Sequence, residues 1–597
     1  MTRFQVWPDA WPQSHPDGWP EGPVRLNNVL VPLGSVGLEV VKNPGGARSG
    51  DREGFMRTSL TIREGRIAEP MGDETALDCA GALVMPGFVD CHTHLDKGHI
   101  WRRTPNPDGT FDGALNAVAG DREKCWSGED VAARMAFSLE AAHAHGTVAI
   151  RTHLDSGDAR SESTWEVFAQ ARETWAGRVA LQGAALTTLE DVFSDDFERL
   201  ADLVATHEGV LGAVTYPLPD MPARLDRFFK LAADRGLNAD FHADESLNPE
   251  SETLREIAEA RLRNNFEGRV LAGHCCSLAI LPEDQADRTM DLVAEAGIDI
   301  VSLPLCNLYL QDRVPGRTPR YRGVTLVHEL VARGVNVSFA SDNTRDPFYA
   351  YGDLDMVEVL REATRIAHLD HPVGDWPASF AANPARAMGL TGGTLTPGAP
   401  ADFVIFPAAR GWTELNARPQ SDRVVIRGGR PLGTAAPAYD RLDPVVIEGS
   451  AHTAVAPDIA GAKAALAHLD LDDHPKTVLQ KSRDFYWYSP VLKAKLEGVT
   501  ADFVIAPRSV DEVVEVMRVA YAHNVPVTTR GSGTGNYGQA MPLSGGIVLH
   551  MKHMTKILEL EHGRILAEAG IVLADLDRET REKTNQELRI HPSTHGT

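Results

Sequence analysis

The sequence lacks three features that would assign it to a specialised class of protein. Lys and Arg number 59 against 83 Asp and Glu, so the net charge of -24 leaves no basic excess for nucleic acid or an anionic membrane surface. No apolar run is long enough to span a bilayer. Residues 1–20 show no basic-then-apolar signal pattern. We therefore expect a cytoplasmic protein with no nucleic-acid or membrane partner.

Cysteine is also scarce, and its spacing excludes a disulfide framework. The six cysteines contain no CxxC pair, and the adjacent Cys275 and Cys276 are poorly placed to bond to each other. We expect free thiols. The chain of 597 residues, 43% hydrophobic and 24% charged, has an ordinary globular composition and is long enough for two or three domains.

Two histidines follow the apolar run 82–89. If this run is a buried strand, alternate side chains share one face, so His92 and His94 point the same way. Neutral imidazoles in that arrangement can bind one metal ion. A bare His-x-His pair is also typical of two polar residues in a loop.

Strand-like segments at the two ends of the first 435 residues enclose a long alternating region. Short β-like pieces in 1–81 and in 391–435 predict a small β-sandwich. Between them, over 82–390, apolar strands alternate with helical runs such as 130–144 and 222–235. About eight such units favour an α/β fold with a (β/α)8 TIM-type barrel; an open doubly wound sheet is the alternative.

Polar residues capable of catalysis follow five of these apolar runs. A barrel gathers the carboxyl ends of its strands on one face, where catalytic residues lie, so the five groups predict one site. In chain order the groups are His92 and His94, His153 with Asp155, His242 with Glu245, His274, and Asp342 with Asn343.

With these groups in place, residues 25–435 resemble the amidohydrolase superfamily, and within it the bacterial cytosine deaminase branch. The motifs that carry the resemblance are His92-Thr-His94-Leu-Asp, Arg151-Thr-His153-Leu-Asp155, Phe241-His242-Ala-Asp-Glu245, Gly273-His274, Pro304-Leu-Cys-Asn307, and Asp342 followed by Asp346-Pro-Phe-Tyr349.

The resemblance implies one divalent metal, iron or zinc, held by His92, His94, His242 and Asp342. Such a metal lowers the pKa of water toward neutrality. The resemblance also implies that Glu245 protonates a ring nitrogen and carries a proton to the departing ammonia, and that His274 orients the water. Asp342 would accept the proton of the water as well as bind the metal.

The chain departs from the cytosine deaminase pattern where that family recognises its substrate. Residues 185–188 read Ala-Leu-Thr-Thr in place of a segment with a pyrimidine-binding glutamine, and Asn343 stands where the family has an aspartate. We assign Thr188, Asn343 and His153 as substrate-binding residues. The expected reaction is deamination of cytosine or a related cyclic amidine, such as isocytosine, a methylated cytosine or creatinine.

Three other functions remain open from the sequence. A cyclic-amide ring-opening hydrolase would use the same barrel, but no second ligand set and no bridging lysine are evident. A flavin-dependent oxidoreductase would leave the barrel as a second activity. A binding protein without catalysis is opposed by the intact ligand set. We also expect the chain to form a homo-oligomer.

The composition changes after residue 435, which predicts a linker over 436–455 and a further domain over 456–597. A strand over 500–507, a helix from Ser509 to about Asn524 and a strand over 525–529 lead into a glycine-rich loop. The stretch resembles the PCMH-type FAD-binding domain of vanillyl-alcohol oxidase and glycolate oxidase. This implies FAD contacts at Thr528, Thr529, Arg530, Gly531, Ser532, Gly533, Thr534 and Gly535. Only the first half of that fold is recognisable, so we expect weak FAD binding unless a second chain completes the domain.

Overall fold

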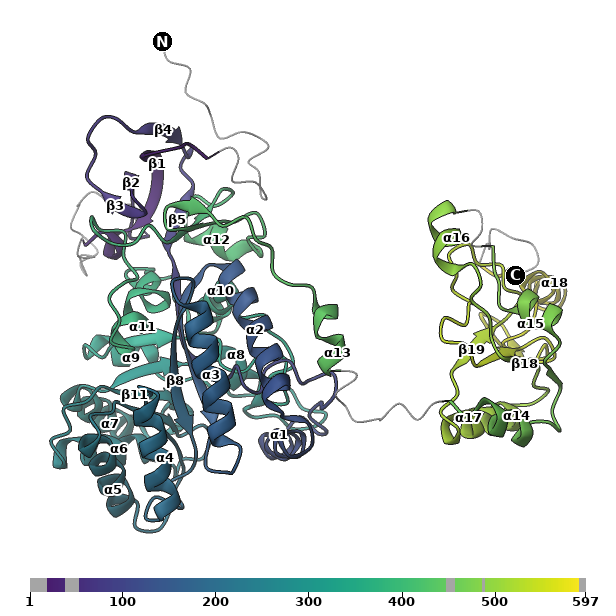
Figure 1. Ribbon diagram of the computed structural model, residues 1–597, viewed down its shortest axis with the longest axis horizontal. Coiled ribbons are helices and arrows are strands. Elements are labelled where there is room, and N and C mark those ends of the chain that lie inside the picture. Colours follow the sequence, from purple (N-terminus) through teal and green to yellow (C-terminus); the bar gives the residue numbers. More distant parts are fainter. Residues whose placement is uncertain (1–18, 38–52, 447–456, 486–488, 590–597) are drawn as a thin grey trace. The chain divides into compact units, whose positions relative to one another are not determined.

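The structure is a computed structural model that describes residues 19–37, 53–446, 457–485 and 489–589. It divides into two compact units, Met1–Ser450 and Ala451–Thr597, shown in Figure 1. Each unit has its own hydrophobic core.

The first unit contains a mixed eight-stranded sheet built from both of its ends. β14 pairs antiparallel with β5, so the strand Phe403–Phe406 lies beside Leu83–Pro86 although more than 300 positions separate them in the chain. The sheet runs in the order β16-β15-β14-β5-β1-β2-β3, with β4 beside β1. Its other strands are β1 (Val24–Pro32), β2 (Phe55–Arg63), β3 (Arg66–Ala68), β4 (Thr75–Asp78), β15 (Val424–Arg427) and β16 (Arg430–Pro431).

The eight strands between these ends are parallel wherever they pair, and they follow chain order. One sheet has the order β6-β7-β8, and another has the order β13-β12-β11-β10-β9. Isolated parallel bridges join β8 to β9 and join Thr93 to Asp342 after β13. The strands are β6 (Phe88–Thr93), β7 (Thr147–Asp155), β8 (Ala180–Leu186), β9 (Leu211–Thr215), β10 (Ala239–Ala243), β11 (Val270–His274), β12 (Asp299–Ser302) and β13 (Val337–Phe339).

Helices connect the successive parallel strands and lie outside them (Figure 1). Capping residues set their ends: the Ser127 side chain accepts a hydrogen bond from Asp130 N at the start of α2, and Gly146 ends that helix at φ 100°. The helices of this unit are α1 (Phe111–Cys125), α2 (Gly128–His145), α3 (Ser161–Trp175), α4 (Asp195–Thr206), α5 (Met221–Asp234), α6 (Thr253–Arg263), α7 (Glu283–Ala296), α8 (Pro304–Leu310), α9 (Val327–Ala332), α10 (Met356–Ala367), α11 (Ala382–Ala387) and α12 (Trp412–Ala417).

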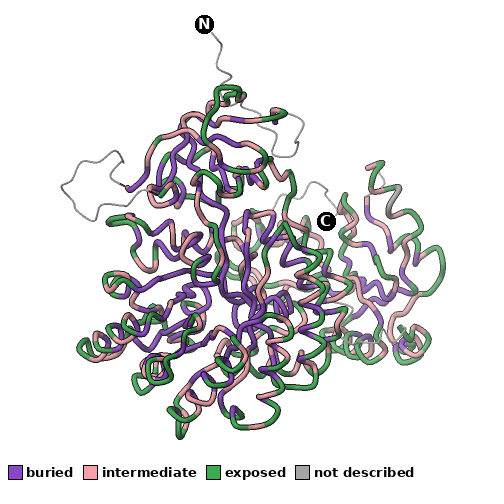
Figure 2. The backbone as a smooth tube through the Cα atoms, turned by 60° about the vertical axis from the view of Figure 1, so that its left-hand side comes forward, coloured by how far each residue is buried: buried purple, intermediate pink, exposed green. Residues whose placement is uncertain are grey.

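The parallel strands contribute buried residues to the core of the first unit. Every residue of β10 and β11 is buried, as parallel strands covered on both faces require. Figure 2 shows buried residues along the strands and exposed ones on the outer turns of the helices. None of the described helices combines the length and the apolar character needed to cross a membrane.

Part of the predicted linker packs on the first unit. The 3-10 turn Tyr439–Leu442 and the short helix α13 (Asp443–Val446) follow the sheet, and Leu442 and Val446 are buried against Phe137 of α2. The remainder of the predicted linker, 447–455, lies outside the described residues.

The second unit has a four-stranded sheet of order β17-β18-β20-β19 and a hairpin, β21 with β22. The predicted helix after Ser509 is confirmed as α17, and the Ser509 side chain accepts a hydrogen bond from Glu512 N at its start. The predicted flanking strands are confirmed as shorter ones, β18 and β19. The elements are β17 (Leu471–Asp472), β18 (Phe503–Ile505), β19 (Val527–Arg530), β20 (Ile547–His550), β21 (Ile557–Glu561), β22 (Arg564–Ala567), α14 (Ile459–Ala465), α15 (Pro475–Lys481), α16 (Pro490–Leu496), α17 (Val510–Ala522) and α18 (Leu573–Thr584).

We predict that Phe403→Ala destabilises the first unit by about 3–5 kcal/mol, because Phe403 is fully buried in β14 and its removal leaves a cavity. Urea unfolding followed by tryptophan fluorescence measures the change. The matched control is Phe193→Ala, where the ring is 57% exposed and the expected loss is below about 1 kcal/mol. Equal losses in the two variants would contradict the assignment of β14 to the core.

Candidate metal centre

Three strand ends bring the four predicted metal ligands together. His92 lies on β6, His94 follows that strand, His242 lies on β10 and Asp342 follows β13. A backbone hydrogen bond from Asp342 N to His92 O (2.9 Å) holds the end of β13 beside β6. The buried Asp90 carboxylate supports this junction, because it accepts hydrogen bonds from Ser341 N at 3.1 Å and from Ser341 Oγ at 2.5 Å.

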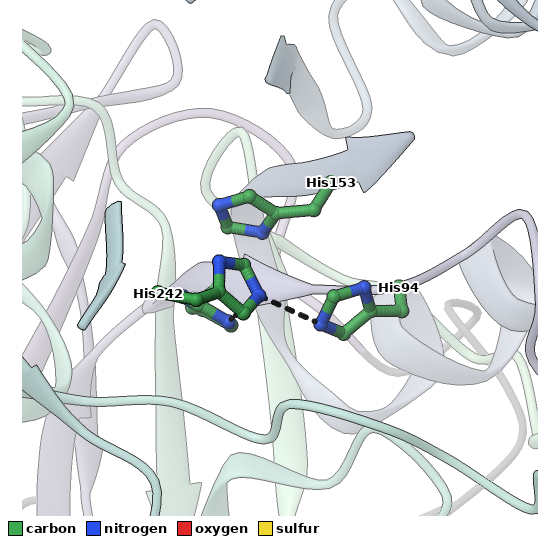
Figure 3. Close-up of side chains that lie close together, drawn as sticks. His94, His153 and His242 are labelled. Atoms are coloured by element: carbon green, nitrogen blue, oxygen red, sulfur yellow. Dashed lines mark hydrogen bonds between the residues drawn. The ribbon is translucent and has the colours of Figure 1, made fainter. Parts of the chain in front are cut away.

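The ligand atoms of these four residues face one another at short range. His92 Nε2 lies 3.1 Å from His242 Nε2, and His242 Nε2 lies 3.4 Å from His94 Nε2. Asp342 Oδ1 lies 3.2 Å from His94 Nε2 and 3.6 Å from His92 Nε2. Figure 3 shows the rings of His94, His153 and His242 gathered around one point.

These distances fit a single metal ion. Ligands about 2.1 Å from a tetrahedrally coordinated ion lie roughly 3.4 Å from one another, which matches these four separations. Neither carboxylate oxygen of the buried Asp342 has a conventional hydrogen-bond partner among the described residues. An uncompensated buried carboxylate is costly, and a cation between it and the three imidazoles would balance its charge. The residues present therefore suit a divalent metal.

The protonation states favoured by burial also suit metal binding. Burial lowers the pKa values of His92, His94 and His242 well below the ordinary histidine value, and the neighbouring histidines, joined by Lys97 for His94 and His242, lower them further. The imidazoles are therefore neutral at pH 7, the state in which their nitrogens bind a metal. Burial raises the pKa of Asp342 to about 8, while Cys306 and Lys97 act in the opposite direction. A cation at this point would favour the carboxylate form.

His153 belongs to the same cluster but contacts protein atoms. Its ligand atoms and those of His92, His94 and His242 lie within 4.8 Å of one another. Its Nε2 lies 3.1 Å from Asp240 Oδ1, and its Nδ1 lies 3.3 Å from Thr93 O. Both ring nitrogens thus lie beside groups of the protein, and the substrate contact assigned to His153 stays a prediction.

Glu245 and His274 form a pair next to the metal ligands. His274 Nδ1 lies 3.3 Å from Glu245 Oε1 and 3.0 Å from Asn307 Nδ2. His274 also lies with His92 and Asp342 in a group whose ligand atoms are within 4.8 Å of one another. Burial lowers the pKa of His274 to about 3. Burial and the charge of Asp342 raise the pKa of Glu245 well above its ordinary value, against the effect of Lys97. A protonated Glu245 can act as a proton donor.

Backbone geometry at the site departs from ordinary strand ends. His274 and Asp342 adopt φ values of 66° and 64°, a region that non-glycine residues rarely occupy. Such strain is common where a side chain must be aimed at a functional site. Gly273 precedes His274, and a Cβ atom at this position would come within 2.9 Å of the His92 ring. The Gly273-His274 pair therefore allows two ligand-bearing strands to approach closely.

Lys97 and Asp240 are two site residues to which the sequence analysis gave no role. Lys97 is 4% exposed, and its Nζ lies 2.5 Å from Asp155 Oδ1 and 5.7 Å from the centre of the Phe348 ring. Although burial lowers the pKa of Lys97, Asp155 and Asp96 raise it above its ordinary value, so it remains a cation. The available signal in the sequence was a lysine three positions after His94, in the segment that follows the predicted strand.

Asp240 contacts His153 of the histidine cluster and forms an ion pair with Arg151. Arg151 Nη1 lies 2.7 Å from Asp240 Oδ2, and both side chains are fully buried. Burial raises the pKa of Asp240, but His153 and Arg151 together hold it below the ordinary aspartate value. Asp240 stands two residues before His242 on β10, and the period of two along a strand, which places both side chains on one face, was the signal that could have found it.

The structure shows where the other two predicted substrate contacts, Asn343 and Thr188, lie, but their contact with substrate stays a prediction. Asn343 is buried, where its Nδ2 donates to Asp346 Oδ2 at 2.7 Å and its Oδ1 accepts from the Cys306 thiol at 3.5 Å. Thr188 follows β8, and Glu190 N donates a long hydrogen bond of 3.4 Å to its hydroxyl oxygen.

The predicted flavin contacts span the end of β19 and the loop after it. The Arg530 guanidinium donates to Lys481 O at 3.0 Å and Arg483 O at 2.6 Å. Gly533 has φ 72°, a backbone conformation that favours glycine, and a Cβ atom there would displace the Arg530 guanidinium. FAD binding by Thr528–Gly535 stays a prediction.

Known protein families match the sequence of each of the two units. An Amidohydrolase family model matches residues 75–207 and 205–434, and an FAD binding domain model matches residues 501–597. The chain is 52% identical over 402 residues to a protein named pterin deaminase from Rhizobium rhizogenes (strain K84 / ATCC BAA-868), a match covering 66% of this chain and 92% of that protein. The chain therefore belongs to the amidohydrolase family.

Two further relatives help to define the units. The structure of 5-methylcytosine deaminase from Klebsiella pneumoniae liganded with 5-fluorocytosine superposes with a TM-score of 0.57 at 24% identity, covering 68% of this chain and 97% of that one, and shares the fold. Glycolate oxidase subunit GlcD of Bacillus subtilis (strain 168) is 39% identical over 84 residues, which are 14% of this chain and 18% of that protein. The C-terminal unit thus carries part of an FAD-binding domain.

We predict that the purified protein, loaded with zinc or ferrous iron and then desalted, retains about one divalent metal per chain. His242→Ala and Asp342→Ala should retain far less, because each removes a ligand atom from the cluster. Elemental analysis by mass spectrometry provides the measurement. His371→Ala, whose side chain is 92% exposed, is the matched control and should retain full metal content. Full loading of the Asp342→Ala variant would refute the assigned ligand set.

Proposed function

We propose that the protein is a metal-dependent deaminase that releases ammonia from a 2-amino-4-oxo nitrogen heterocycle, with pterin as the substrate class. The observation that carries this proposal is the convergence of His92, His94, His242 and Asp342 on one point, with Glu245 3.3 Å from His274 beside it. The 52% identity to a protein named pterin deaminase supports the choice of ring.

We propose further that the eight parallel strands form one closed (β/α)8 barrel. The isolated bridges from Thr93 to Asp342 and from Thr188 to Val214 support closure of the two sheets into a single ring. In such a barrel the ligands on β6, β10 and β13 share the carboxyl-terminal face. We also retain the division into sheet segments at 1–81 and 391–435, a barrel at 82–390 and a flavin-type domain at 456–597.

The chemistry follows from groups that the chain supplies. Hydrolytic deamination joins a water oxygen to the carbon that bears the amino group, breaks the carbon–nitrogen bond and leaves a carbonyl with free ammonia. A divalent ion held by the four ligands supplies Lewis acidity, which makes water more acidic near neutral pH. Glu245 in its protonated form donates to the ring nitrogen beside that carbon, recovers a proton from the hydroxyl of the adduct as the carbonyl forms, and passes it to the departing amine. His274 orients the water, and Asp342 accepts the first proton of the water, which returns to Glu245 at the end of the cycle.

The substrate ring follows from the chemistry of the pterin nucleus. The pyrimidine half of pterin is an isocytosine, one of the cyclic amidines that the sequence predicted. Cytosine places its amino group and its carbonyl in exchanged positions, so recognition of one ring differs from recognition of the other. The absence of a glutamine at 185–188 and the presence of Asn343 support a ring other than cytosine.

A second ligand is proposed for the C-terminal unit. The FAD binding domain match over 501–597 supports flavin contacts at Thr528–Gly535. We propose FAD as a ligand of this unit, separate from the deaminase reaction. A flavin absorption spectrum on titration with FAD tests it.

Ammonia release from a set of ring compounds tests the function. We expect turnover of pterin and of isocytosine, with weaker or no turnover of cytosine, 5-methylcytosine and creatinine. Coupled measurement of ammonia with glutamate dehydrogenase gives the rates. Turnover of cytosine alone would restore the cytosine deaminase prediction, and ring opening without ammonia would favour a cyclic-amide hydrolase.

Glu245→Gln should reduce turnover by about 10²- to 10⁴-fold while metal content stays unchanged, because the amide cannot deliver the proton. The rate of ammonia release and the metal content are measured on the same preparation. Glu250→Gln, an exposed change five positions away, is the control and should keep normal turnover. Near-normal turnover in Glu245→Gln would exclude Glu245 as the proton donor.

A further inference from the structure

Helix α17 of the second unit exposes an apolar stripe. Val510, Val514, Met517 and Tyr521 have exposed fractions of 64%, 47%, 48% and 90%. A different face of the same helix is used by the core of the unit, where Val516 and Ala520 are buried. The exposed stripe is therefore additional to the face that holds the helix in its own unit.

The spacing of the stripe is that of a coiled-coil seam. The four residues stand at i, i+4, i+7 and i+11, which is the 3–4 alternation of the d and a positions of a heptad. Such residues align along one side of a helix and pack into the matching side of another helix. The pattern favours a second helix as the occupant of this surface.

Two charges of opposite sign flank the stripe. Asp511 and Arg518 stand one position after Val510 and Met517, at the two e positions, and both are exposed. Within the described part of the chain, neither side chain forms a hydrogen bond or an ion pair. A partner helix for this face should therefore offer one cation and one anion in complementary positions.

We propose that α17 is a self-association surface, on which α17 of a second copy of this chain packs antiparallel. With the two-fold axis between Val514 and Met517, Val510 lies opposite Tyr521 of the second copy, and Val514 lies opposite Met517 of the second copy. The e positions between these two layers bring Asp511 beside Arg518 of the second copy, and the symmetry repeats the pair. Two ion pairs then flank four apolar layers, which are two pairs related by the two-fold axis.

A parallel arrangement lacks this complementarity. In a parallel pair an e position meets a g position of the other helix, and the g residues here are Val513 and Ala520. Asp511 and Arg518 would then both remain unpaired. The charges thus select the antiparallel orientation and a second copy of this chain.

The contact is small, and its strength is limited accordingly. A seam of four residues from each copy is well below the ~800 Å² per partner of a standard interface, so we expect association in the micromolar range or weaker. Such a contact adds to any association made by the first unit. The proposal is independent of the deaminase reaction.

Engineered cysteines in the full-length chain test the geometry. All six natural cysteines are buried or partly buried, so an exposed engineered thiol gives a specific signal. An equimolar mixture of Val510→Cys and Tyr521→Cys should form a disulfide-linked dimer under mild oxidation. Each variant alone should not, because two copies of one position lie about 16 Å apart along the antiparallel pair. Absence of the mixed dimer, or crosslinking of a single variant, would overturn the proposal.

Charge reversal tests the specificity. Asp511→Arg alone and Arg518→Asp alone should each weaken self-association at least threefold, and the double variant should restore it. Analytical ultracentrifugation over a concentration series measures the dissociation constants, and circular dichroism confirms folding. Single variants that associate as well as the wild type, or a double variant that stays weak, would contradict pairing with a second copy. Loss of association in Met517→Glu is expected in the same assay.

Discussion

The convergence of three buried imidazoles and one buried carboxylate is the constraint on which the rest of the first unit depends. Four of the six distances between their ligand atoms are 3.1 to 3.6 Å, and burial keeps the imidazoles neutral. The imidazole nitrogens face one another with their lone pairs. The carboxylate beside them receives no conventional hydrogen bond from any described group. This arrangement is poorly stable unless a cation lies between the groups. The fold holds this arrangement through backbone contacts such as Asp342 N to His92 O.

The titratable groups around this centre form separate buried contacts. Glu245 and His274 lie together on one side, held by Asn307. Lys97 is fixed by Asp155, and its positive charge acts on Asp342 and Glu245. Arg151, Asp240 and His153 form a buried chain of charged and polar groups behind the ligands. A buried network of this kind is stable only when its members are paired, which explains why charged residues extend into the core here.

The two units contribute different chemistry to one chain. The first belongs to the amidohydrolase family and contains the metal-binding cluster. The second carries part of an FAD-binding domain, with a glycine-rich loop after β19 and a helix whose outer face is apolar. Since each unit has its own core, a contact between copies through α17 would leave the metal-binding cluster intact.

The sequence by itself determined the alternation of strands and helices, the strand ends that carry His92, His242, His274 and Asp342, and the start of α17 at Ser509, because periodicity and capping are local properties. It also indicated that the ligands would meet, through the parallel-strand rule. Only the tertiary structure decided that Lys97 and Asp240 belong to the site, that residues 439–446 pack on α2, and that β14 lies beside β5. These features depend on contacts between residues distant in the chain. Their energies come from burial and charge pairing, which no local pattern of residues encodes.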